Sequence, residues 1–258
     1  MADTDEGTFE LNEVSWWSNW TDTVWLGKDA YLLFSHDFKE YFFNRGGFLR
    51  MTGRAAGLVD TMEVEFAAHG LIPHVFVQSD SLTTRLLQNF AKKGYRIADQ
   101  MSVMEAESPS FKVNPKLTLE MGVDGKLERW ADVYLKAFYG DTKLSKAVLA
   151  VLERVSKNKE ASLLLASLGD RPVGALALFR SPGMLGVYCV GTIPDMRGAH
   201  VASTMLDFSN RLAINEGRKL ILQTILSDSV ESFYLKLGFR RAYLKELFVR
   251  DSGRTLKS

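Results

Sequence analysis

The order of apolar segments in the second half of the chain is the feature that most restricts the fold. From residue 117 onward, short apolar runs alternate with amphipathic stretches, and turn-forming residues separate them. The order reads strand, helix, helix, three strands, helix, strand, helix, strand. Because the apolar runs are too short for buried helices, they predict strands. The expected strands are 117–121, 162–167, 172–179, 185–191, 219–224 and 239–249, and the expected helices follow Asp124, begin near Leu144, span 199–217 and begin at Ser227 or Asp228.

Helical periodicity and turn signals support this order. Apolar residues three and four positions apart form a stripe from Leu127 to Phe138 and another from Val201 to Leu212. Turn signals at Gly169 and at 182–183 divide the three central runs, which we expect to be neighbouring antiparallel strands. The pattern predicts an α/β (α+β) fold with a mixed, mainly antiparallel sheet flanked by helices.

The first half of the chain repeats part of this pattern. The segment 54–59 resembles 197–202, and 93–96 resembles 237–240, at offsets of 143 and 144 positions. Between these anchors each half shows a helix, a strand and a helix, which predicts an internal duplication. We therefore expect one domain over residues 1–110 and a second over 111–258, joined by the proline- and serine-containing segment 108–115.

Composition limits the classes of partner. The formal net charge is +1, which favours neither nucleic acid nor a membrane surface as a partner. The single cysteine, Cys189, excludes an internal disulfide and suits a reducing compartment. The four histidines show no metal-ligand spacing, and the acidic start of the sequence has no secretory pattern. We expect a cytoplasmic protein without a metal site.

The segment from Val190 to Ala202 carries the clearest candidate chemistry. A strand ends there, a loop containing Pro194 follows, and a helix opens after Arg197 and Gly198. The first N–H groups of such a helix are unpaired, and the helix dipole favours an anion beside them. This pattern predicts a phosphate or pyrophosphate site. The alternative is an ordinary strand-to-helix turn with a surface arginine.

Tyr234 is the second candidate. It lies four residues before Gly238, on the apolar stripe of its helix, so one interpretation is a core tyrosine. The other is catalytic, because a phenol with a pKa near 10 holds its proton at neutral pH and can give it to a departing thiolate.

The two motifs resemble those of a known family. The run Val-x-Thr-x-Pro-x-x-Arg-Gly-x-x-Val-Ala, followed about 30 residues later by Tyr-x-Lys-x-Gly-Phe, is similar to the GNAT superfamily of N-acetyltransferases, over residues 115–250. The resemblance implies that acetyl-CoA binds here and that Tyr234 protonates the thiolate of coenzyme A. It places the pantetheine arm along Cys189, Val190, Gly191 and Thr192, the pyrophosphate on Arg197, Gly198, Ala199, His200, Val201 and Ala202, and Ser227 where the family often has asparagine.

The sequence departs from the family pattern at three places. His200 stands where the family usually has glycine, so its side chain either crowds the pyrophosphate or reaches its oxygens. Ser227 keeps a hydroxyl but lacks the amide of asparagine. In the first half, Phe90 takes the position of Tyr234 and no Thr-x-Pro loop precedes Arg54. The resemblance therefore implies a tandem protein whose N-terminal domain is degenerate and forms either a wall of the acceptor site or a dimer surface.

The function implied is transfer of an acetyl group from acetyl-CoA to a primary amine of a small molecule or peptide, by direct attack. Backbone N–H groups near Val190 would polarise the carbonyl. A longer acyl donor, an aminoacyl donor and a non-catalytic acyl-CoA-binding protein are the alternatives, and a homodimer is left open. Glu120, Tyr188 and Asp228 are unranked candidates for the general base.

Two further features have competing interpretations. Cys189 is either a nucleophile or a small buried residue. The aromatic residues between Trp16 and Phe43 either line an acceptor pocket or pack between the domains.

Overall fold

The computed structural model describes residues 5–122 and 127–250, and these form two compact units. The first unit contains the chain up to Val103, then Thr224–Glu231, and the chain from Arg241 onward. The second contains Met104–Gln223 and Ser232–Arg240. Neither unit is continuous in sequence. The expected boundary between residues 110 and 111 therefore stays a prediction about domains, and each unit is described separately below.

The second unit contains five of the six strands predicted from the apolar runs, and the sixth, expected over 239–249, is β11 (Phe239–Arg250), which belongs mainly to the first unit. The strands of the second unit lie in the order β10-β9-β8-β7-β6. The three central runs are neighbouring antiparallel strands, as expected, and β9 and β10 are parallel, with Met184 opposite Lys219 and Val187 opposite Leu222. The strand bounds are β6 Leu117–Met121, β7 Ala161–Leu168, β8 Arg171–Ser181, β9 Met184–Thr192 and β10 Lys219–Ile225.

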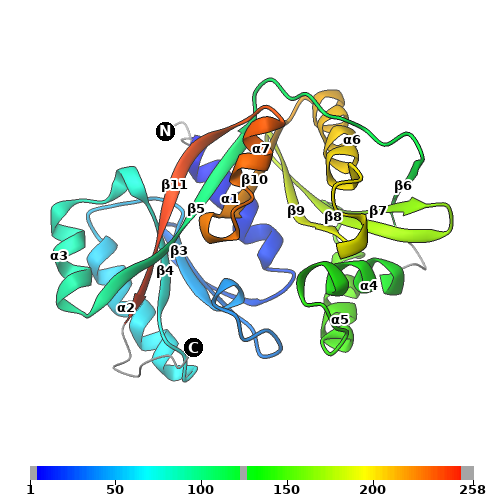
Figure 1. Cartoon of the computed structure of the whole chain (residues 1–258). Coiled ribbons are helices and arrows are strands. Elements are labelled where there is room, and N and C mark those ends of the chain that lie inside the picture. The colour runs from blue at the N-terminus through cyan, green and yellow to red at the C-terminus, as the bar shows by residue number, and fades with distance from the viewer. Residues whose placement is uncertain (1–4, 123–126, 251–258) are drawn as a thin grey trace. The chain divides into compact units, whose positions relative to one another are not determined.

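Helices pack closely on both faces of this sheet (Figure 1). On one face α4 (Leu127–Phe138) lies so near β9 that a Cβ atom on Gly191 would be 2.9 Å from the Ala137 Cβ atom. On the opposite face α6 (Val201–Asn215) lies so near β8 that a Cβ atom on Gly174 would be 2.5 Å from the Val201 Cγ1 atom. Glycine is needed at both places because no side chain fits. The helix α5 (Ser145–Val155) packs beside α4.

Two predicted helix starts were displaced. The helix expected from residue 199 begins at Val201, after a turn that holds Gly198 and His200 with positive φ. The last helix, α7, spans Glu231–Lys236 rather than beginning at Ser227 or Asp228, which belong to a 3₁₀ turn. Asp124, the expected cap of the first helix, lies outside the described residues.

The strands of the first unit lie in the order β1-β2-β3-β4-β11-β5 and pair in both parallel and antiparallel directions. The strands β3 and β4 are parallel, and β11 is antiparallel to β4, with Lys245 opposite Gln78. An apolar core joins α2 and α3 to the sheet, and Phe90 of α3 stacks on Phe248 with 4.1 Å between ring centroids. The bounds are α1 Asp5–Trp17, β1 Asp22–Leu26, β2 Ala30–Phe34, β3 Arg45–Phe48, α2 Ala55–Ala68, β4 His74–Gln78, α3 Thr84–Lys92, β5 Tyr95–Ala106 and β11 Phe239–Arg250.

The halves of the chain repeat the order helix, strand, helix, strand. In the first half this is α2, β4, α3 and β5, and in the second it is α6, β10, α7 and β11. Both β5 and β11 are 12 residues long, and each follows a glycine with positive φ, Gly94 or Gly238. This correspondence agrees with the duplication expected from sequence.

Candidate active site

A bulge in β9 marks the candidate site. The register of β8 and β9 passes from Ala177 opposite Tyr188 to Ala175 opposite Gly191, so Cys189 and Val190 together oppose one residue of β8. Cys189 has a φ of 53°, in the left-handed region. A bulge of this kind bends the strand and turns backbone groups out of the ladder. The bulge lies within the segment where the family resemblance places the pantetheine arm.

The same segment of β9 has no parallel partner on β10. Pairing of β9 with β10 covers Met184 to Val187 on β9 and ends at Leu222 on β10. Beyond that rung β9 continues through the bulge to Thr192, without further paired residues on β10. An extended ligand can take the place of the missing strand and use the backbone groups of β9.

The turn before α6 exposes a group of N–H donors. A 3₁₀ turn, Pro194–Met196, follows β9, and then both Gly198, with φ of 83°, and His200, with φ of 57°, take left-handed conformations. Within the described part of the chain, no acceptor is found for the backbone N–H groups of five residues. These residues are Gly198, His200, Val201, Ala202 and Ser203. Consecutive free N–H groups at a helix N-terminus form an anion site.

Two carbonyl groups of this turn, those of Ala199 and His200, already accept hydrogen bonds. Ser203 and Thr204 each donate a side-chain hydrogen bond to the His200 carbonyl, at 3.1 and 2.6 Å. Asn114, in the segment before β6, donates to the Ala199 carbonyl at 3.0 Å. These contacts hold the start of α6 in place, with its N–H groups available to a ligand. The residues present therefore fit a pyrophosphate group.

Arg197 is engaged at a different place from the one implied by the resemblance. Its Nη2 atom donates to the Ala137 carbonyl at 3.2 Å, near the C-terminus of α4. A cation there interacts favourably with the dipole of α4. The side chain thus links the turn to α4, and its contact with a pyrophosphate stays a prediction.

A cavity of about 390 Å³ lies beside the 3₁₀ turn. Its two cationic side chains already have partners, since Arg171 pairs with Asp195 at 2.5 Å and Lys136 pairs with Asp132 at 2.7 Å. It lies next to the candidate site rather than at the bulge. It is lined by Asp132, Lys136, Gly140, Arg171, Pro172, Ile193, Pro194 and Asp195.

The other predicted residues are placed as follows. Burial raises the pKa of the Cys189 thiol well above its usual value, which opposes a nucleophilic role and favours the alternative of a small residue in the bulge. The Tyr234 ring is buried, edge-on to Phe239 at 5.9 Å between centroids. Ser227 belongs to the first unit, where its hydroxyl donates to the Asp99 carboxylate. The structure therefore does not bring Ser227 into the second unit with the α6 turn.

The candidate bases differ in surroundings. Tyr188 is buried on β9, immediately before the bulge, and Glu120 lies on the edge strand β6. Asp228 belongs to the first unit, where burial raises its pKa and the neighbouring Asp99 raises it further. No contact ranks one of these groups above the others.

The corresponding turn of the first half has a different backbone conformation. Arg54 is itself the cap of α2, in right-handed helical conformation, and its N–H lies 3.4 Å from the Thr52 hydroxyl oxygen. Gly57, which the sequence comparison aligned with His200, lies inside α2. Among residues 49–57 none has a positive φ. The first half therefore has no counterpart of the turn at 198–200.

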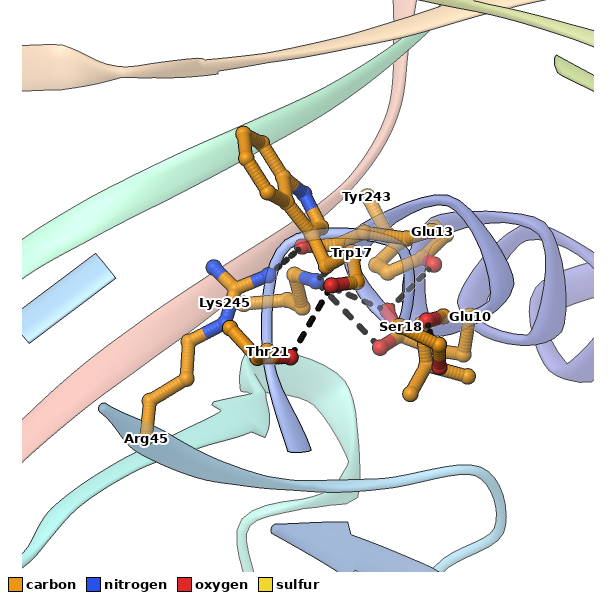
Figure 2. Close-up of polar contacts among 9 residues, drawn as sticks. Glu10, Glu13, Trp17, Ser18, Thr21, Arg45, Tyr243 and Lys245 are labelled. Atoms are coloured by element: carbon orange, nitrogen blue, oxygen red, sulfur yellow. Dashed lines mark hydrogen bonds and ion pairs between the residues drawn. The ribbon is translucent and has the colours of Figure 1, made fainter. Parts of the chain in front are cut away.

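Sequence reasoning missed a buried ionic cluster in the first unit (Figure 2). Glu13 of α1 accepts hydrogen bonds from Arg45, at 2.6 Å, and from Lys245 of β11. Glu10 pairs with Lys245 at 3.1 Å and accepts from the Tyr243 hydroxyl at 2.7 Å. All four charged side chains are at most 2% exposed. Because solvent does not reach it, the cluster is structural rather than a substrate site.

The aromatic residues near α1 pack inside the first unit. Trp16, Trp17 and Trp20 are buried and contact one another with 5.9 to 6.3 Å between ring centroids. Phe38 and Phe43 pack on Trp20. These contacts favour packing over an acceptor pocket, but they are core contacts of the first unit rather than the expected packing between domains.

Comparisons with known proteins identify the fold. The structure is similar to a GCN5-related N-acetyltransferase from Kribbella flavida, with a TM-score of 0.68 and 14% identity over 97% of each chain. It is similar to one from Sphaerobacter thermophilus, with a TM-score of 0.66 and 17% identity over 95% of this chain and 90% of that one. A tandem GNAT protein from the clavulanic acid biosynthesis pathway matches with a TM-score of 0.60 and 10% identity, over 92% and 85%.

These likenesses establish a GNAT fold, including the tandem form. Because the sequence identities are low, they establish the fold alone. No protein-family model matches the sequence, and no curated protein matches it. Within residues 5–122 and 127–250, no helix is long and apolar enough to cross a bilayer. The same residues contain no cluster of three or more histidine, cysteine, aspartate or glutamate side chains that could hold a metal ion.

Proposed function

We propose that the protein is a cytoplasmic N-acyltransferase that moves the acetyl group of acetyl-CoA to a primary amine of a small molecule or peptide. The observation that carries this proposal is the group of free N–H groups at Gly198 and from His200 to Ser203, adjoining the bulged end of β9 that has no partner on β10. A ligand that fits both features needs an anionic group joined to an extended arm. Coenzyme A thioesters have this form.

In this proposal the backbone does most of the binding. The N–H groups at the start of α6 hold the pyrophosphate, where the helix dipole favours negative charge. Residues Cys189 to Thr192 pair with the pantetheine arm as they would with a strand. Holding both reactants in place supplies much of the rate enhancement, because attack becomes effectively unimolecular.

The chemistry requires one proton removed and one supplied. The deprotonated amine attacks the thioester carbonyl, a carbon–nitrogen bond forms, and the carbon–sulfur bond breaks. Tyr234 gives its proton to the departing sulfur, and an N–H group near Val190 stabilises the negative charge on the carbonyl oxygen. Glu120, Tyr188 and Asp228 remain candidates for the base that takes the proton of the amine.

A non-catalytic acyl-CoA-binding protein is the second candidate, because His200 places a side chain at a left-handed position that the family usually fills with glycine. A longer acyl donor or an aminoacyl donor is the alternative among enzymes. Donor choice is tested by thiol release with acetyl-CoA and with longer acyl-CoA thioesters.

Thermal melting tests binding first. Acetyl-CoA and coenzyme A should both raise the melting temperature, since each binds only the folded state; no shift with either would remove the proposal.

Thiol release with a panel of primary amines then tests catalysis. The Tyr234→Phe variant should lose activity at least tenfold while its melting shift with coenzyme A is kept. Full activity in that variant would remove the acid role, and binding without turnover would leave the non-catalytic candidate.

A further inference from the structure

Gln223 is a polar residue in an otherwise apolar part of β10. The residues before it, Leu220, Ile221 and Leu222, are all at most 2% exposed. The Gln223 side chain is partly buried, and its Nε2 atom is buried without a hydrogen-bond partner in the described part of the chain. A buried donor without an acceptor destabilises the fold, so native proteins rarely keep one without a reason.

Gln223 lies at the point where β9 and β10 separate. Leu222 and Val187 form the last parallel pair, so Gln223 is the first residue of β10 beyond the ladder. On β9 the next residues are Tyr188 and the bulge at Cys189. The free amide is therefore positioned beside the segment of β9 that has no partner on β10.

The alternation of side chains places Gln223 on the α4 face of the sheet. Gly191 packs against Ala137 of α4, and Gly191 is opposite Ala175 on β8. Tyr188, opposite Ala177, lies on the same face as Ala175 because side chains two positions apart share a face. Val187 and Leu222 point to the other face, so Gln223 points to the α4 face, as Tyr188 does.

We propose that the Gln223 side-chain amide donates a hydrogen bond to a carbonyl oxygen of the acyl-pantetheine arm, and so fixes the depth at which the donor enters between β9 and β10. This assignment rests on the proposed function. The arm offers two kinds of carbonyl, its amides and the thioester, and either would satisfy the Nε2 atom. A protonated amine acceptor would not, because an ammonium group has only donors.

The test compares the Gln223→Leu variant with wild type by calorimetric titration of coenzyme A and acetyl-CoA. Removing an unpaired buried amide should leave the melting temperature of the free protein unchanged or higher, whereas affinity for the donor should fall about three- to tenfold. If Gln223 had a purely structural role, the variant would melt at a lower temperature and would keep its affinity for the donor. Ser167→Ala is the matched control, because Ser167 is also buried in the second unit with an unpartnered hydroxyl.

The two ligands separate the two carbonyls. Equal weakening of both ligands assigns the contact to an amide of the arm, and weakening of acetyl-CoA alone assigns it to the thioester. Unchanged affinity for both, with wild type binding normally, would overturn the role of Gln223 and leave the proposed function intact. Failure of wild type to bind either ligand would overturn the proposed function together with this inference.

Discussion

At the scale of single residues, three non-glycine residues within 5–122 and 127–250 have a left-handed backbone conformation. They are Cys189, His200 and Ser229, and two of them lie in the candidate site. Such conformations strain an ordinary residue and gather at functional positions. Cys189 lies in the bulge of β9, and His200 is the last residue before α6. The left-handed backbone at this position favours glycine, which the family usually has there. His200 adopts the same conformation under strain.

Replacing His200 tests that explanation. The His200→Gly variant should be at least as stable as wild type, because glycine adopts positive φ without strain. The His200→Ala variant should be less stable than the glycine variant by about 1 kcal/mol, because alanine keeps the Cβ penalty. Urea denaturation measures both free energies of unfolding. Equal stability of the two variants would show that the turn at 198–200 is not strained in solution.

At the scale of helices and strands, local features could be predicted from the sequence, whereas contacts between distant elements could not. The strands of the second unit followed from short apolar runs, because each run is a local signal. The bulge at Cys189 could not be predicted, since it is a property of how β8 and β9 pair. The helix α1 and its ion pairs were missed for the same reason, because Glu13 meets Lys245 across almost the whole sequence.

The docking of α1 depends on the charge of Glu13. Burial raises the pKa of Glu13, but the adjacent Lys245 and Arg45 outweigh it and hold the pKa below its usual value. A depressed carboxyl pKa stabilises the fold above the unfolded-state pKa of about 4.3, and this contribution is lost as the pH falls through the folded-state pKa. The Glu13→Gln variant should therefore be about 3 kcal/mol less stable than wild type at pH 7, because it leaves Lys245 and Arg45 without full compensation.

The pH series gives the decisive comparison for Glu13. The difference in free energy of unfolding between wild type and Glu13→Gln should shrink as the pH falls below about 4.3, because the unfolded wild-type chain then takes up a proton on Glu13. Lys136→Met is the control, since the Lys136–Asp132 pair is exposed and should contribute less than about 1 kcal/mol. A difference that stays constant down to pH 3 would show that the Glu13 charge does not hold α1.

At the scale of the whole molecule, both halves repeat one order of elements, but the left-handed turn is found only in the second half. Both halves have a parallel strand pair, β3 with β4 and β9 with β10. Only the second has left-handed residues before the following helix, at Gly198 and His200. Sequence comparison aligned Gly57 with His200, yet Gly57 lies inside α2, because two turns of similar sequence adopt different backbones. The prediction that the first half is degenerate therefore rests on the turn itself as well as on Phe90.

The central claim is that the start of α6 binds the pyrophosphate of an acyl-CoA donor. Its most direct test is calorimetric titration of acetyl-CoA and of acetyl-pantetheine, which keeps the arm and thioester but lacks the pyrophosphate. Because charged hydrogen bonds to several N–H groups should contribute well over 1.4 kcal/mol in sum, acetyl-CoA should bind at least about tenfold more tightly. Equal affinity for the two ligands, or no binding of acetyl-CoA, would contradict the claim.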